Sequence, residues 1–170
     1  IYIIFALLFI TITSIFAQVP QQEQILLDNL AAARSNTDLE GFEYQQGIYR
    51  ALSSLVTYYW TNGNYTKVEE IMIEQLSIME TYNGRDSEGY AQTLSNLGEL
   101  YTNIGQYEKA KNTYAAANDI YERLDVINNP VWYIQSQGGT GIVLMMQGNY
   151  QDAEKYLLHA SVLCDKYRLD

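Results

Sequence analysis

Residues 94–117, LSNLGELYTNIGQYEKAKNTYAAA, have the pattern of two amphipathic helices joined by a tight turn. Leu94, Leu97 and Tyr101 recur at steps of three and four residues, which places their side chains on one face of a first helix. Gly105 follows, and glycine takes the left-handed backbone conformation that ends a helix without steric cost. The stretch therefore predicts that the first helix stops at this glycine.

The second half of the stretch predicts a helix that packs against the first. This helix begins at Tyr107, and its inner face carries Ala110, Tyr114 and Ala117. Small residues such as Gly98 and Ala110 allow the two helices to approach closely, whereas the larger tyrosines fill the space between neighbouring pairs. We therefore expect an antiparallel helix pair.

The same turn occurs three times in the chain. In each copy a glycine stands two residues before a tyrosine, and Gly63, Gly105 and Gly148 are 42 and 43 residues apart. The copies align without gaps over LVTYYWTNGNYTKVEE (55–70), LGELYTNIGQYEKAKN (97–112) and TGIVLMMQGNYQDAEK (140–155). Self-similarity at a fixed period is typical of repeat architectures, so the sequence predicts three stacked helix pairs.

Residues that favour a helix start precede the second and third copies. Asp86 or Ser87 can cap the helix of the second copy, because their side-chain oxygens can accept a hydrogen bond from a free backbone N–H. In the third copy Asn129 can serve as the cap, with Pro130 in the first turn.

Residues 94–117 resemble a tetratricopeptide repeat almost position for position. The small residue of the family's first helix falls on Gly98, and the aromatic residue that follows it falls on Tyr101. The alanines of the family's second helix fall on Ala110 and Ala117. The standard period is 34 residues, so the spacing here adds about one helical turn to each helix. Longer repeats of this kind are similar to those of kinesin light chains and of bacterial proteins with many such repeats.

The other two copies fit the family less evenly. The third copy matches at Gly141, Leu144, Ala153, Leu157 and Ala160. The first is degenerate, because Val56 and Val68 stand where the family has small residues.

The resemblance implies an all-α fold, a tetratricopeptide-type α-solenoid of antiparallel helix pairs that forms a right-handed superhelix. The first helix of each pair should line its concave side. We expect a repeat domain over residues 18–170, with a leading helix at 21–35 and repeats at about 39–82, 87–124 and 130–168. The expected helices are 21–35, 39–61, 65–82, 87–104, 107–124, 130–147 and 150–168. The last helix should expose an apolar edge at Leu157, Ala160, Val162 and Leu163.

The first residues of the chain have the pattern of an export signal. Residues 1–16, IYIIFALLFITITSIF, contain no charged side chain, and Ala17 is small enough for the position before a signal-peptidase cut. The sequence therefore predicts a signal peptide at 1–17 and an exported protein, periplasmic or extracellular. An initiating Met and a basic leading region are missing, so an uncleaved membrane anchor stays open as the alternative.

Composition excludes several kinds of function. A formal net charge of −10 argues against electrostatic binding of nucleic acid. The single cysteine, Cys164, and the single histidine, His159, cannot form a conventional zinc site. Gly138–Gly141 lacks the Gly-Lys-Ser/Thr of a phosphate loop, and its glycines are expected to serve helix packing. We expect no cofactor, no metal and no enzymatic activity.

Acidic side chains are expected on solvated helix faces. These are Glu69, Glu70, Asp152 and Glu154, and no histidine accompanies them.

The resemblance places the binding surface on the first helices. The predicted groove residues are Arg50, Ser53, Thr57 and Trp60 in the first copy, Gln92, Ser95, Asn96, Glu99 and Asn103 in the second, and Gln135, Gly138, Ile142 and Met145 in the third. The family's clamp for a peptide carboxylate needs two or three Lys or Arg and two Asn, whereas only Arg50 and Asn96 are present here. Trp60 and the methionines have an alternative interpretation as core residues.

Two hypotheses for the function follow. The chain is an exported scaffold or adaptor that binds polypeptide segments on its concave face. Alternatively, it is the N-terminal regulatory array of a larger exported protein, whose protease-like or signalling effector domain follows residue 170.

Overall fold

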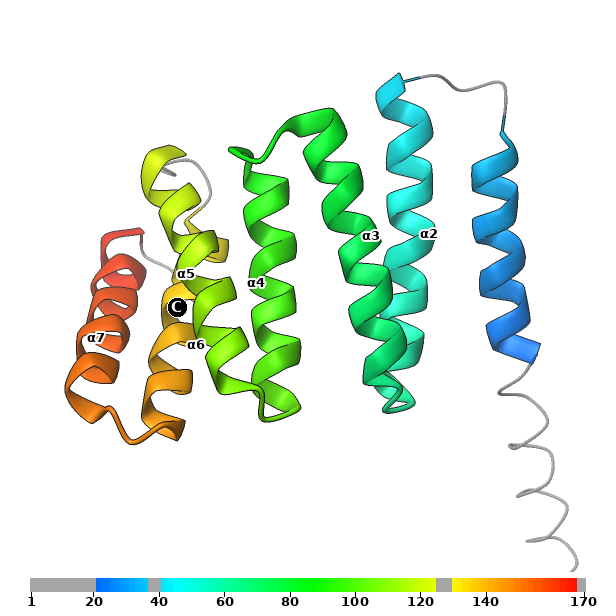
Figure 1. Cartoon of the computed structure of the whole chain (residues 1–170). Coiled ribbons are helices and arrows are strands. Elements are labelled where there is room, and N and C mark those ends of the chain that lie inside the picture. The colour runs from blue at the N-terminus through cyan, green and yellow to red at the C-terminus, as the bar shows by residue number, and fades with distance from the viewer. Residues whose placement is uncertain (1–20, 37–40, 125–129, 168–170) are drawn as a thin grey trace, which may run out of the picture. The chain divides into compact units, whose positions relative to one another are not determined.

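Every regular element that the structure describes is an α-helix (Figure 1). The structure is a computed structural model that describes residues 21–36, 41–124 and 130–167. The helices are 21–35, α2 Gly41–Thr61, α3 Tyr65–Asn83, α4 Glu88–Asn103, α5 Tyr107–Leu124, α6 Val131–Met146 and α7 Tyr150–Tyr167. The predicted all-α fold is confirmed, and the helix ends lie within about two residues of their predicted positions. None of the described helices is long and apolar enough to cross a bilayer. The predicted export segment, 1–17, lies outside the described residues.

The chain divides into two compact units, Ile1–Asn64 and Tyr65–Asp170. In the first unit, two tyrosines of α2 join it to the helix of residues 21–35. Tyr59 donates a hydrogen bond of 2.6 Å to the Glu23 carboxylate, and Tyr44 donates one of 2.7 Å to the Arg34 carbonyl. Leu30 is buried in the leading helix. The predicted leading helix is therefore present and is held by side chains that are distant in sequence.

In the second unit, successive helices pack as antiparallel pairs. α4 contacts α5, α6 contacts α7, and α5 joins the two pairs by contacting α6 (Figure 1). Ala91, Ala117, Ile120 and Tyr121 form a buried cluster between α4 and α5. Burial of this apolar surface is what stabilises such a stack, because each pair has a hydrophobic face only toward its neighbours.

The three repeated turns have the predicted glycine conformation. Gly63, Gly105 and Gly148 have φ values of 71°, 75° and 78°, which other residues rarely adopt. After Gly105, the N–H of Gln106 donates to the Tyr101 carbonyl at 2.8 Å, which satisfies a carbonyl at the end of α4. The same bond recurs after the other two glycines, so each repeat ends its first helix in the same way.

The helix starts agree in part with the predicted caps. Ser87 caps α4, and its hydroxyl accepts a hydrogen bond of 3.4 Å from the Tyr90 N–H. Asp86, the alternative cap, instead forms an ion pair of 2.6 Å with Arg123 of α5. Pro130 occupies the N-cap position of α6 without a side-chain hydrogen bond, and Asn129 lies outside the described residues.

The packing between repeats corrects the prediction for one acidic residue. Glu69 of α3 is not on a solvated face, because its carboxylate accepts a hydrogen bond of 2.7 Å from the Tyr101 hydroxyl of α4. Lys109 of α5 lies 3.7 Å from the same carboxylate and covers the Tyr101 ring at 5.0 Å. Periodicity could not reveal this partner, since Glu69 and Tyr101 are 32 residues apart.

The last helix exposes only part of the predicted apolar edge. Leu157 and Val162 are exposed, and Leu163 is half-buried. Ala160 is buried, so its assignment to this edge was wrong. Its methyl group lies on the buried face of α7, as Ala153 does seven residues earlier.

Candidate peptide-binding groove

A groove of about 420 Å³ lies between α4 and α6, within the second unit. Its walls come from the first helices of two successive repeats, where the family resemblance places a binding surface, and one side chain of α5 reaches it from between them. The lining residues are Ser95, Asn96, Glu99, Thr102 and Asn103 of α4, Tyr114 of α5, and Gln135, Gly138, Gly139 and Ile142 of α6. These positions recur at steps of three and four along α4 and α6, so each helix presents one face to the groove.

The structure brings seven of the predicted groove residues together here. They are Ser95, Asn96, Glu99, Asn103, Gln135, Gly138 and Ile142. Two other predicted residues of these helices lie beyond its lining. Gln92 is half-buried one turn before Asn96, and Met145 is exposed one turn after Ile142.

The four predicted residues of the first copy belong to the first unit and are not part of this groove. Arg50 and Thr57 are exposed on α2, and Ser53 and Trp60 are half-buried. The Ser53 and Thr57 hydroxyls donate to the carbonyls four residues earlier, at 2.9 and 3.1 Å. Arg50 donates to the Gln46 side chain at 3.2 Å.

Three lining residues were not predicted for the site: Thr102, Gly139 and Tyr114, of which Tyr114 is the largest. Its ring passes between two glycines, Gly98 of α4 and Gly139 of α6, to reach the groove from α5. A Cβ atom at Gly98 would lie 2.9 Å from the Tyr114 ring, and one at Gly139 would lie 2.6 Å from its hydroxyl oxygen. Both distances are too short for a side chain, so the two glycines form the opening that Tyr114 needs. The signal that could have revealed Tyr114 is the pair of glycines in successive first helices. The sequence pattern predicts only close helix packing at these glycines.

The Tyr114 hydroxyl stays protonated at neutral pH and can donate a hydrogen bond. Burial raises the pKa of Tyr114 to about 12, the Thr102 side chain opposes that rise, and the nearby Glu99 carboxylate adds to it. The groove therefore combines hydroxyl and amide groups that both donate and accept hydrogen bonds.

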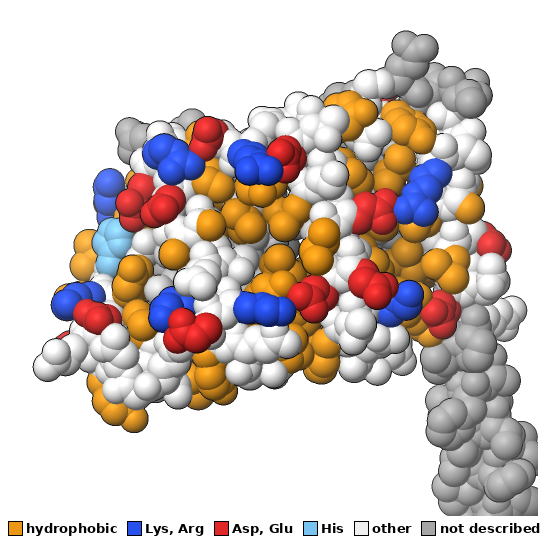
Figure 2. Space-filling view, in the orientation of Figure 1, with side chains coloured by type: hydrophobic (Ala, Val, Ile, Leu, Met, Phe, Trp, Pro, Cys, Tyr) orange, Lys and Arg blue, Asp and Glu red, His pale blue; other side chains and the backbone are white. Residues whose placement is uncertain are grey.

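The groove has one charged side chain among the residues that line it, Glu99. α4 and α6 contain no Lys or Arg at all. Instead, the described lysines lie on α3, α5 and α7, where acidic partners stand beside most of them, as the paired blue and red side chains in Figure 2 show. The residues that line the groove are thus polar, with a single negative charge.

Comparison with known proteins accounts for this arrangement of helices. A sequence profile described as tetratricopeptide repeat matches residues 47–123. Residues 47–123 are tetratricopeptide repeats. The profile covers most of the first two copies, and the structure extends the same helix pairing to α6 and α7.

Two solved structures are similar to this chain over a larger part of its length. The structure of the apo form of RapI aligns with a TM-score of 0.73 at 19% identity, covering 91% of this chain and 53% of that one. The structure of BtubC (BKLC) from P. vanneervenii aligns with a TM-score of 0.67 at 20% identity, covering 73% and 49%. The chain thus spans about half the length of each, and at these identities the likeness shows the α-solenoid fold alone. The comparison with curated proteins found no match.

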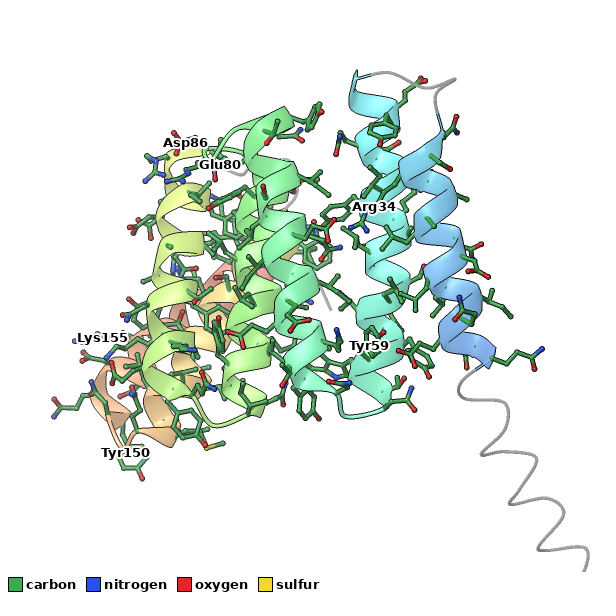
Figure 3. All side chains as sticks on the ribbon, turned by 45° about the vertical axis from the view of Figure 1, so that its right-hand side comes forward. Arg34, Tyr59, Glu80, Asp86, Tyr150 and Lys155 are labelled. Carbon is green, nitrogen blue, oxygen red and sulfur yellow. The ribbon has the colours of Figure 1, made fainter. Side chains whose placement is uncertain are left out.

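A second groove of about 510 Å³ lies between α5 and α7, over α6. Its two lysines already have acidic partners within the chain. Lys111 lies 2.8 Å from Glu108, and Lys155, labelled in Figure 3, lies 2.7 Å from Asp152. The hydrogen bonds from these lysines hold the pKa values of both carboxyl groups below their ordinary values. A ligand would have to displace these internal partners, so the α4–α6 groove is the better candidate.

Within the described part of the chain, no three His, Cys, Asp or Glu side chains are grouped to hold a metal ion. His159 packs the edge of its ring against Tyr133, with ring centroids 5.8 Å apart. Cys164 is a free, half-buried thiol. The tetratricopeptide fold typically serves as a scaffold for other proteins rather than as a catalyst.

Proposed function

We propose that the groove between α4 and α6 binds an extended polypeptide segment, and that the chain acts as an interaction scaffold without enzymatic activity of its own. The observation that carries the proposal is the lining of the groove. Asn96, Asn103 and Gln135 each offer an amide donor and an amide acceptor, which is what the N–H and C=O groups of an extended peptide require. The tetratricopeptide fold supports a protein or peptide partner.

Backbone recognition of this kind depends on few charges. The carboxylate clamp known from the family needs several cations in the groove, and α4 and α6 supply none. We therefore propose that an internal segment, rather than a free C-terminal carboxylate, is bound.

The experiment that tests this function is selection from a displayed library of random 12-residue peptides against the full chain. Peptides that bind are then measured against an Asn96→Ala/Gln135→Ala variant. We expect selected peptides to bind the wild type and to lose affinity about tenfold or more for the variant, because two neutral hydrogen-bonding groups are removed, each of which contributes about 1 kcal/mol.

A matched control changes the same residue types elsewhere. Asn112 of α5 and Gln151 of α7 are exposed and do not line the groove, so Asn112→Ala/Gln151→Ala should bind as the wild type does. Circular dichroism must show equal helix content in all three proteins. Selected peptides that bind the groove variant as tightly as the wild type would contradict the proposal.

We also propose that the chain is exported, on the apolar and uncharged pattern of residues 1–17. The measurement is the intact mass of the protein recovered from a bacterial envelope or culture supernatant. A mass that matches a chain starting at Gln18 supports cleavage after Ala17. Recovery from the membrane fraction at the mass of the uncleaved chain supports a membrane anchor instead. The second hypothesis, a regulatory array ahead of an effector domain, stays a prediction that uses the same groove.

A further inference from the structure

We infer that the α4–α6 groove selects a polypeptide segment that carries a lysine or arginine side chain, which ion-pairs with Glu99. This inference rests on the proposed function and adds the chemistry of the segment. Its basis is charge complementarity: the only charge in the groove lining is negative.

Glu99 differs from the acidic residues that join helices in this protein. Glu69, Asp86 and Glu108 each have a cationic partner within 4 Å, on the same or a neighbouring helix. Among the residues that the structure describes, no Lys or Arg pairs with Glu99. Its backbone carbonyl accepts a hydrogen bond of 3.0 Å from the Asn103 side chain, whereas its carboxylate is exposed at the groove.

The position opposite Glu99 favours a long basic side chain over a small cation. Glu99 and Ile142 are 43 residues apart, which is one repeat, so they occupy equivalent positions on α4 and α6. Ile142 is 41% exposed and carries no polar group. Lysine and arginine combine an aliphatic stem with a charged end, so the stem can cover Ile142 while the end reaches the carboxylate.

Acidic segments should be disfavoured by the same geometry. A carboxylate brought beside Glu99 would meet no compensating cation on α4 or α6, and like charges oppose binding in a partly desolvated groove. The groove would therefore discriminate between segments by the sign of one side chain, while amide and hydroxyl groups hold the backbone.

The test uses four peptide mixtures with one defined position. Each peptide has eleven residues with blocked ends, neutral mixed residues at ten positions, and Lys, Arg, Gln or Glu at the centre. Fluorescence polarisation measures the apparent Kd of each mixture for the full chain at low ionic strength. We expect the Lys and Arg mixtures to bind about threefold more tightly than the Gln mixture, the ratio typical of an exposed ion pair, and the Glu mixture to bind more weakly. The advantage should shrink in 0.5 M salt.

Two variants separate a local ion pair from general attraction to an acidic protein. Glu99→Gln should remove the advantage of the Lys and Arg mixtures, so that the ratio of their Kd values to that of the Gln mixture becomes about one. Glu154→Gln removes the same charge from an exposed position on α7 outside the groove and should keep the advantage.

The outcomes distinguish the two levels of the proposal. If all four mixtures bind the wild type equally, or if Glu99→Gln keeps the preference for Lys and Arg, the inference is overturned while peptide binding stands. If none of the mixtures binds the wild type, the proposed function fails and the inference fails with it.

Discussion

At the scale of single residues, Tyr114 connects the packing of the repeats to the chemistry of the groove. The residue belongs to α5, yet its ring passes between α4 and α6 and contributes to the groove lining. Its ring is packed as a structural wedge, and the buried side chain forms part of the groove wall. The two glycines that border it, Gly98 and Gly139, therefore matter for the site as well as for the fold.

Neighbouring glycines of α6 should respond oppositely to the same substitution. A methyl group at Gly139 would overlap the Tyr114 ring, so Gly139→Ala should lower the free energy of unfolding by about 1–3 kcal/mol. At Gly138 an added Cβ meets no atom within 4 Å, and alanine favours the helix. Gly138→Ala should therefore raise the free energy of unfolding by up to about 1 kcal/mol. Urea unfolding followed by circular dichroism measures both. Equal shifts of the same sign would contradict the glycine opening described for Tyr114.

At the scale of helices, local chemistry explains which predictions succeeded. Helix ends were predictable because Gly63, Gly105 and Gly148 impose a cap through backbone conformation alone. The candidate site could be predicted only from the family resemblance, which places the binding surface on the first helices of the repeats. The resemblance could not reveal Tyr114, which enters from another helix, or the Glu69 partner of Tyr101, because these contacts depend on how helices distant in sequence are placed.

The Tyr101 side chain should contribute much of the free energy with which α3 packs against the α4–α5 pair. Tyr101→Ala removes a buried ring and should lower the free energy of unfolding by about 3–5 kcal/mol. Tyr101→Phe keeps the ring and removes only the hydrogen bond to Glu69, so it should cost about 1–2 kcal/mol, as is typical of a bond to a charged group. The comparison is made by urea unfolding, and Tyr82→Phe, at a 41% exposed position of α3, serves as a control outside this contact. Equal losses for Ala and Phe would show that the hydrogen bond, and not the ring, couples the helices.

At the scale of the whole molecule, basic residues are distributed unevenly between the first and second helices of the repeats in the second unit. The second helices of the repeats carry the described lysines, and neighbouring acidic residues match most of these charges. The first helices, α4 and α6, carry no basic residue. Because the excess of acid over base gives the whole chain a net charge of −10, partners without cationic groups gain nothing from the electrostatic field of the protein. The inferred basic segment would be favoured by the groove and by the chain as a whole.

The buried tyrosines of the second unit should make its stability sensitive to alkaline pH. Burial is the main cause that raises the pKa values of Tyr101, Tyr114 and Tyr121 to about 12, against 10 for an exposed tyrosine. Since the folded pKa is the higher one, the neutral hydroxyl favours the folded state fully below pH 10, and that contribution is lost as the pH rises from 10 toward 12.

The free energy of unfolding should therefore fall across this interval, and part of the tyrosinate absorbance at 295 nm should appear only as the pH approaches 12. In Tyr114→Phe the fall should be smaller, because one of the three groups no longer titrates, while the helix content at neutral pH is retained. Tyr150→Phe is the matched control, since Tyr150 is 69% exposed and its substitution should leave the fall in stability as large as in the wild type. A single absorbance step near pH 10 in the folded protein would contradict the burial of these three hydroxyl groups.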